Sequence, residues 1–195
     1  MTKNLSIVFV RNPELGKVKT RLAKTIGDKK ALNIYILLLK HTESVLQKVS
    51  SDKVVYYSEE IQSNDLWSNR CFQKKLQKGN DLGERMQHAF ETAFKEGYEK
   101  VVIVGSDLFD LKAVHIENAF KALENHNLVI GPSLDGGYYL LGMKVLHPAV
   151  FKNKQWGTDS VLETTLKNLE QENVKLLEAL NDIDTFDDLQ GHPEL

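Results

Sequence analysis

Four basic side chains gather in one short loop near the start of the chain, and their spacing indicates an anion site. The loop follows residues 5–10, an apolar segment that predicts a buried strand, and ligands of α/β proteins bind where such strands end. Pro13 stiffens the exit from the strand, and Gly16 permits a tight turn or a close approach of the backbone. Because the cations repel one another, they are either solvated or face an anion such as a polyphosphate. They are Arg11, Lys17, Lys19 and Arg21.

A second segment places a carboxylate after another apolar strand. Residues 101–104 predict a strand that ends in Gly105-Ser106-Asp107. A carboxylate in this position can hold a hard divalent cation such as Mg²⁺, which takes oxygen ligands and is shared with substrate phosphates. We therefore favour a metal role for Asp107 over a simple turn cap, whereas Asp110 is expected to cap the next helix.

A third segment, residues 182–189, is rich in aspartate. Asp182 and Asp184 are expected to point to opposite sides of an extended stretch, so that one reaches a metal while the other caps a turn. Thr185, followed by Asp187 and Asp188, resembles a helix start with acids near its N-terminus. Capping accounts for the last two aspartates and accounts less well for Asp184.

Two further segments could border a ligand. The Asp-Gly-Gly tripeptide at 135–137 is either ordinary hairpin chemistry or a place where backbone N–H groups approach a ligand, with Tyr138 and Tyr139 as an aromatic wall. Trp156 either lines a pocket or fills the core. Thr158 is a natural N-cap for the helix that follows.

The elements that must position these segments alternate between short apolar runs and amphipathic stretches, which is typical of an α/β domain with a mostly parallel sheet. Asp81 and Glu84 resemble a capping box at the start of one helix, and Gly97 suits its end. No repeat or linker divides the chain, so one domain over residues 1–195 is expected. Strands are predicted at 5–10, 53–58, 71–76, 101–104, 127–131 and 138–143, and helices at 28–49, 82–96, 113–125, 159–173 and 185–190.

The composition narrows the function classes. A net charge of −2 over 195 residues lacks the footprint of a nucleic-acid binder, yet it allows a local basic site. Cys71 is the only cysteine, which excludes a disulfide framework and a thiolate zinc cluster. No signal-like start is present, and no apolar run approaches the roughly 20 residues of a membrane span, so a cytoplasmic protein is expected. Dinucleotide, P-loop, nucleophile-elbow and H-E-x-x-H motifs are missing.

Taken in order, these segments resemble a family of small bacterial transferases with the nucleotide-diphospho-sugar-transferase (GT-A) fold. Its members are known as radical-SAM-associated glycosyltransferases and are related to phospholactate and molybdenum-cofactor guanylyltransferases. The resemblance covers nearly the whole chain, and the order of the motifs is more specific than any one of them. The motifs are Phe9-x-x-x-Pro13-x-x-Gly16-x-Val18-Lys19-Thr20-Arg21-Leu22, Gln77-x-Gly79-x-Asp81-Leu82-Gly83-Glu84-Arg85-Met86, Gly105-Ser106-Asp107, Gly131-Pro132-x-x-Asp135-Gly136-Gly137-Tyr138-Tyr139, Trp156-x-Thr158 and Asp182-Ile183-Asp184-Thr185.

The resemblance implies a three-layer αβα fold with a mostly parallel, Rossmann-like sheet, and it implies roles for single residues. Asp107 would bind Mg²⁺ or Mn²⁺ with help from Asp184, and Asp135 would border the donor sugar or acceptor; if the reaction is glycosyl transfer, Asp135 is the candidate to position or deprotonate an acceptor hydroxyl. The residues implied in nucleotide binding are Pro13, Gly16, Lys17, Lys19, Arg21, Gly79, Asp81, Gly83, Arg85 and Ser106. Those implied at the donor sugar or acceptor are Gly136, Gly137, Tyr138, Trp156 and Thr158.

Two positions depart from the family's usual pattern. Phe109 stands where the family usually has proline, so the fixed φ of proline is lost and the loop after Asp107 could take another shape. This change bears on acceptor geometry more than on metal binding. Arg11 stands where lysine is usual, which keeps the charge and changes the reach of the side chain.

The first hypothesis is therefore a metal-dependent glycosyltransferase that moves a sugar from a nucleotide-sugar to a small acceptor. The alternative is a nucleotidyltransferase that releases pyrophosphate from an NTP. A third hypothesis, prompted by Phe109, is a nucleotide-binding protein without catalysis. A chain this short leaves little room for an acceptor subdomain, so either the acceptor is a small molecule or a second subunit completes the site in a homodimer.

Overall fold

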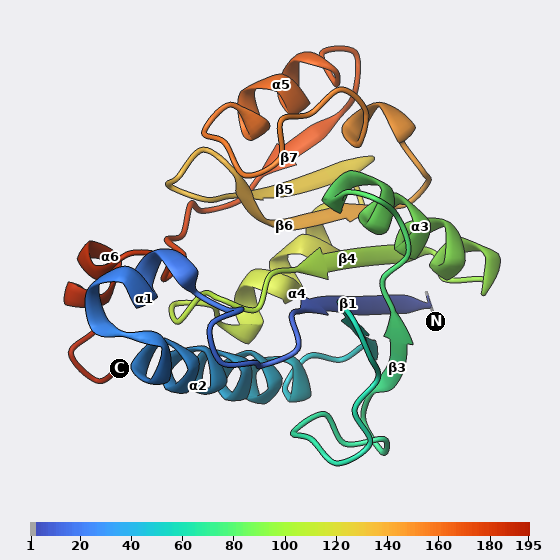
Figure 1. Cartoon of the computed structure of the whole chain (residues 1–195). Coiled ribbons are helices and arrows are strands. Elements are labelled where there is room, and N and C mark those ends of the chain that lie inside the picture. Colours follow the sequence, from blue (N-terminus) through green and yellow to red (C-terminus); the bar gives the residue numbers. More distant parts are fainter. Residues whose placement is uncertain (1–2) are drawn as a thin grey trace.

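One mixed β-sheet receives strands from both ends of the chain in the computed structural model, which describes residues 3–195 (Figure 1). The strand order is β3-β2-β1-β4-β6-β5-β7. β1 pairs in parallel with β2 and β4, β2 with β3, and β5 with β7, whereas β6 is antiparallel to both of its neighbours. The strands are β1 Asn4–Val10, β2 Asp52–Tyr57, β3 Gln73–Leu76, β4 Lys100–Val104, β5 Leu128–Pro132, β6 Tyr138–Met143 and β7 Val174–Leu176.

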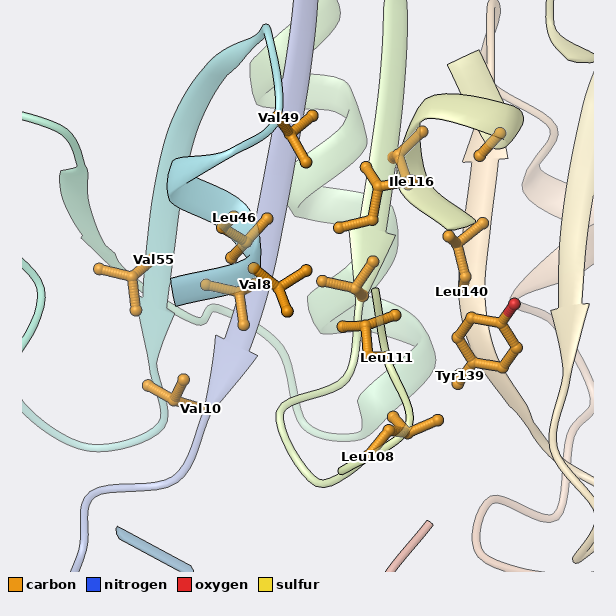
Figure 2. Close-up of a cluster of buried hydrophobic side chains, with 14 of the residues drawn as sticks. Val8, Val10, Leu46, Val49, Val55, Leu108, Leu111, Ile116, Tyr139 and Leu140 are labelled. Carbon is orange, nitrogen blue, oxygen red and sulfur yellow. The ribbon is translucent and has the colours of Figure 1, made fainter. Parts of the chain in front are cut away.

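Helices cover both faces of this sheet and give the expected three layers. Alternate residues of each strand point to opposite faces, so Ile7 joins the apolar cluster under α3 while Val8 joins the one under α2 and α4. Figure 2 shows the second cluster, where Val8 and Val55 of the sheet face Leu46 of α2 and Ile116 of α4. The helices are α1 Thr20–Ile26, α2 Asp28–Gln47, α3 Leu82–Lys95, α4 Ala113–Ala122, α5 Val161–Lys167 and α6 Phe186–Gln190, with the 3₁₀ turn η1 Pro148–Val150.

The topology brings six connections to one edge of the sheet, namely those that follow β1, β2, β3, β4, β5 and β7. β1, β2, β3 and β4 run in the same direction, so the loops that follow them start at the same edge. β6 returns antiparallel between β4 and β5, with Val104 opposite Leu140, and the turn at 133–137 therefore lies at that edge as well. α1 and α6 lie beside each other next to these strand ends (Figure 1). Within residues 3–195, no helix is both long and apolar enough to cross a membrane.

The predicted α/β fold is confirmed, and several local predictions are corrected. The helix expected at 159–173 is only α5, whose N-cap is Ser160 rather than Thr158. The N-cap of α4 is Lys112 rather than Asp110, because the imidazole of His115 accepts the Lys112 amide.

Three short elements lay outside the prediction, namely α1, η1 and β7. α1 has seven residues and ends at Gly27, whose φ of 83° separates it from α2. β7 is a three-residue edge strand. Elements of this length carry too few apolar residues for a recognisable period, so tertiary contacts decide them.

A buried ion pair fixes the connection between β2 and β3. Lys74 Nζ lies 2.6 Å from Asp65 Oδ1, and the two side chains are only 8% and 9% exposed. The same carboxylate accepts hydrogen bonds from the Tyr57 hydroxyl and the Trp67 amide. Since the Asp65 oxygens are thereby satisfied, the connection at 58–72 is held at a defined place beside the sheet edge.

We expect Lys74→Met to lower the free energy of unfolding by about 3 kcal/mol, because it leaves the buried Asp65 carboxylate without its counter-ion. Lys75→Met is the matched control in the same strand. Lys75 pairs with Glu96 at 2.6 Å, but these side chains are 26% and 41% exposed, and such a pair is worth less than about 1 kcal/mol. Urea unfolding of the two variants measures the difference, and equal small losses would contradict the account.

Candidate active site

The segments singled out in the sequence meet in one cleft of about 860 Å³ at the carboxyl edge of the parallel strands. Of the predicted site residues, those that line it are Lys17, Lys19, Arg21, Asp81, Arg85, Ser106, Asp107, Asp135, Gly137, Tyr138, Trp156, Thr158 and Asp184. The remaining predicted site residues lie in the same segments but are not among the described residues that line the cleft. They are Pro13, Gly16, Gly79, Gly83 and Gly136.

The basic loop after β1 meets anionic side chains of the chain itself. Lys19 Nζ lies 3.0 Å from Asp107 Oδ2 and 3.2 Å from Asp184 Oδ1, and Arg21 donates to the other oxygen of Asp184 at 3.2 Å. Lys17 pairs with Glu14 at 2.7 Å near the surface. Burial alone would lower the pKa of Lys19, but the two aspartates outweigh it and hold that pKa above its usual value.

Three carboxylates converge beneath this loop. One oxygen each of Asp107, Asp182 and Asp184 lies within 4.8 Å of the others. Asp182 accepts a hydrogen bond from the Ser133 hydroxyl at 3.1 Å. Burial, with the neighbouring charges of Asp107 and Asp135, raises the pKa of Asp182 to about 6. Sequence reasoning left Asp182 out of the predicted metal ligands.

The prediction that Asp182 and Asp184 point to opposite sides is wrong. In an extended segment, residues two apart share a side, and the residue between them points the other way. Ile183 is that residue, fully buried, and its amide donates to the Asp107 carbonyl at 3.0 Å. The apolar anchor between the two aspartates therefore turns both carboxylates toward the cleft.

These carboxylates fit a divalent cation. They supply the hard oxygen ligands that Mg²⁺ and Mn²⁺ prefer, from three side chains close enough to share one ion. The Asp107 and Asp184 side chains are 36% and 35% exposed, so an ion can reach them from solvent. Asp107, Asp182 and Asp184 could thus hold the metal.

The turn between β5 and β6 is both a hairpin and a wall of the cleft. Asp135 accepts the Gly137 amide at 2.9 Å, and the Ser133 amide donates to the Gly137 carbonyl at 3.0 Å. Hairpin chemistry therefore accounts for this tripeptide, while Asp135 also lines the cavity. Tyr138 stands next to it and meets the Trp156 ring edge to face, with 6.4 Å between centroids.

Trp156 lines the cleft and rests on α3. Gly83 in the first turn of that helix leaves the space that the indole ring fills, because a Cβ there would lie 2.7 Å from the ring. The Asp81 carboxylate accepts the Glu84 amide at 2.8 Å, which confirms the predicted cap of α3. Thr158 is not a cap, because its hydroxyl donates to the Gln155 carbonyl at 2.8 Å.

Two side-chain amides tie the loops of the cleft together, and sequence reasoning assigned a role to neither. Asn12 is 4% exposed and accepts the Glu59 amide at 3.1 Å. Gln77 donates to the carbonyls of Val10 and Tyr56 at 3.1 and 3.0 Å. A polar residue two positions after a buried strand was the available signal for Asn12.

The two departures from the family pattern lie in different surroundings. Phe109 packs against the imidazoles of His41 and His192, at ring-centroid distances of 5.0 and 5.4 Å, and it does not line the cleft of the described chain. Arg11 lines the cleft, and its amide donates to the Tyr35 hydroxyl at 2.9 Å. The loop after Asp107 is thus anchored by Phe109 on its outer side.

Comparison with known proteins relates this chain to transferases. The family described as "Uncharacterized protein conserved in bacteria (DUF2064)" matches residues 41–158. A 2-phospho-L-lactate guanylyltransferase of Methanocaldococcus jannaschii is 27% identical over 138 residues, 70% of this chain and 59% of the relative. The one from Methanocaldococcus vulcanius is 28% identical over 142 residues, 71% of this chain and 61% of the relative. The chain thus spans about three fifths of the length of these curated relatives.

Solved structures share the fold. A crystal structure from Desulfovibrio desulfuricans G20, described as a candidate nucleotide-diphospho-sugar transferase, is 34% identical, with a TM-score of 0.86 over 95% of this chain and 84% of that one. The 4-diphosphocytidyl-2C-methyl-D-erythritol synthase of Anaerococcus prevotii is 12% identical, with a TM-score of 0.63 over 97% and 94% of the two chains, which shows the fold alone. The fold is therefore that of nucleotidyl- and nucleotide-sugar transferases.

We expect Gly83→Ala to displace Trp156 and to lower the free energy of unfolding by about 1–3 kcal/mol, because the new methyl group has no room. Tryptophan emission in a Trp67→Phe background, where Trp156 is the only tryptophan, should shift to the red as the ring becomes exposed.

Gly191→Ala in the same background is the control, since a Cβ there meets its nearest atom at an ordinary 3.6 Å. If Gly83→Ala kept the stability and the emission spectrum of this control, the Trp156 ring would not pack against Gly83.

Proposed function

The chain belongs to the DUF2064 family, and from this membership and the charges of its cleft we propose that it is a metal-dependent glycosyltransferase. It would move a sugar from a nucleotide-sugar to a hydroxyl of a small acceptor. The observation that carries the proposal is the meeting of a basic loop with a cluster of aspartates in one cleft. The cations that line it are Arg11, Lys17, Lys19, Arg21 and Arg85. The acids that line it are Glu59, Asp81 and the four aspartates at 107, 135, 182 and 184.

The basic loop after β1 suits the diphosphate of a donor. The Lys17 and Arg21 side chains are 59% and 63% exposed, so they can turn toward a phosphate with little rearrangement of the fold. Lysine neutralises a phosphate as a point charge, and arginine can bind two of its oxygens at once. These side chains would hold the diphosphate while the sugar is transferred and while the departing group gains charge.

The acidic cluster would hold the metal. Asp107, Asp182 and Asp184 would bind Mg²⁺ or Mn²⁺, an ion that, when bound, supplies Lewis-acid stabilisation of the charge on the departing diphosphate. Asp107 lies three residues after the end of β4, and Asp184 is anchored by its buried neighbour Ile183, so both carboxylates are held close to the sheet. Preorganised ligands of this kind need little rearrangement on binding.

The wall of the cleft that includes Asp135 and Asp182 suits an acceptor without negative charge. An acceptor phosphate there would be repelled by both carboxylates, whereas a hydroxyl could donate to either of them. Asp135 is the residue we assign to orient or deprotonate that hydroxyl. Tyr138 and Trp156 offer an aromatic surface beside it, which suits a sugar ring or an apolar acceptor.

We propose that residues 1–195 carry this reaction as one domain.

A second candidate is guanylyl transfer, favoured by the curated relatives, which are 2-phospho-L-lactate guanylyltransferases. In that reaction an acceptor phosphate would attack an NTP and release pyrophosphate, and no general base is needed. The hypothesis of a protein without catalysis loses its motive, since Phe109 packs on the outer side of the loop and leaves Asp107 in the cleft.

The test is to incubate the protein with nucleotide-sugars and NTPs and Mn²⁺, with water as the acceptor, and to identify the phosphate product by chromatography. We expect slow release of a nucleoside diphosphate from one nucleotide-sugar. Asp107→Asn should reduce it by at least about 100-fold, because a metal ligand is lost. Asp110→Asn is the matched control, since that carboxylate faces His192 at 3.6 Å, and it should retain the rate within about twofold.

Pyrophosphate from an NTP, again lost with Asp107→Asn, would favour the second candidate. Turnover that is indifferent to Asp107 with every donor would contradict both.

A further inference from the structure

Lys19 is the most constrained cation of the cleft. Its φ of 47° and ψ of 44° place it in the left-handed region, which residues other than glycine rarely adopt. Its side chain is 4% exposed, against 59% for Lys17 and 63% for Arg21 in the same loop. Strained backbone of this kind persists only where the surroundings hold it, and it concentrates at functional sites.

The Lys19 ammonium lies between two carboxylates that would bind the metal. It is 3.0 Å from Asp107 and 3.2 Å from Asp184, and within the described chain it is the only lysine or arginine in an ion pair with Asp107. It therefore joins the loop after β1, the loop after β4 and the segment before α6 through one charge. A divalent ion on the same oxygens would lie a few ångströms from this ammonium and repel it.

We propose that Lys19 is a resident counter-ion of Asp107 and Asp184, and that it leaves them when the divalent ion and the nucleotide bind. This inference rests on the proposed function, since it takes the two aspartates as metal ligands. Without a nucleotide the displaced ammonium has no new anion, so the metal alone binds weakly. The diphosphate of a nucleotide supplies that anion, and the metal and the nucleotide therefore favour each other's binding. Lys19 thus weakens the binding of the metal when no donor is present.

The test uses Mn²⁺ alone, without nucleotide, titrated against the full chain and followed by the electron paramagnetic resonance signal of the free ion. We expect Lys19→Met to bind Mn²⁺ about tenfold or more tightly than the wild type, because the competing charge is gone. Lys17→Met is the matched control. It removes the same charge two residues away, but Lys17 pairs with Glu14 and Glu59, so its Mn²⁺ affinity should stay within about twofold.

Removal of Lys19 also leaves Asp107 without its counter-ion and Asp184 with Arg21 alone, which should lower the melting temperature in the absence of metal. Mn²⁺ should then raise the melting temperature of Lys19→Met by more than that of the wild type. Lys19→Gln keeps a hydrogen-bond donor without the charge, and it should shift the Mn²⁺ affinity and the melting temperature in the same direction. The test can therefore be made with Lys19→Gln if Lys19→Met folds poorly.

If both Lys19 variants bound Mn²⁺ no more tightly than the wild type, the inference would be overturned. If Asp107→Asn nevertheless abolished Mn²⁺ binding, the metal site itself would still be supported. Mn²⁺ binding by none of the proteins, with or without a nucleotide, would overturn the inference and the metal-dependent function together.

Discussion

The ion pairs of Lys19 with Asp107 and Asp184 are the interaction on which the candidate site depends. These three residues come from the loop after β1, the loop after β4 and the segment before α6, and the ammonium is buried between the two carboxylates. A buried charge is tolerated only where it is paired, so this contact requires the three segments to meet at one point of the sheet edge. The other walls of the cleft are arranged around that point.

The sheet makes this meeting possible. β1 and β4 are adjacent and parallel, so their following loops start side by side, and the antiparallel β6 brings the turn at 133–137 to the same edge. Apolar side chains cover both faces of the central strands, which leaves the edge as the place where polar groups gather. All the lysines and arginines that line the cleft come from the first 85 residues, whereas the aspartates of the acidic cluster come from the later ones.

Much of this could be predicted from the sequence, because it depended on local signals. Mostly apolar runs predicted β1 and β4, and Asp81 marked the start of α3. The basic loop and Asp107 were recognised because polar residues directly follow buried strands. What was missed depends on contacts between distant segments. Asp182 joins the acidic cluster only through the fold of its segment around buried Ile183.

Other details are invisible in the sequence for the same reason. Gly83 is needed because the Trp156 ring, 73 residues later in the chain, packs against it. Asn12 matters because it binds the backbone after β2. The left-handed backbone of Lys19 carries no local signal, since lysine seldom adopts it. Propensities and periods describe neighbours along the chain, whereas each of these features is set by neighbours in space.

The central claim is that the carboxylate cluster holds a metal beside a diphosphate bound to the basic loop. The most direct measurement is the anomalous difference map of a crystal grown with Mn²⁺ and a nucleoside diphosphate. The account predicts one manganese peak contacting Asp107 and Asp184, with the diphosphate between that ion and the side chains of the basic loop. A manganese peak away from these aspartates, or a diphosphate lying against Asp135 and Trp156, would contradict it.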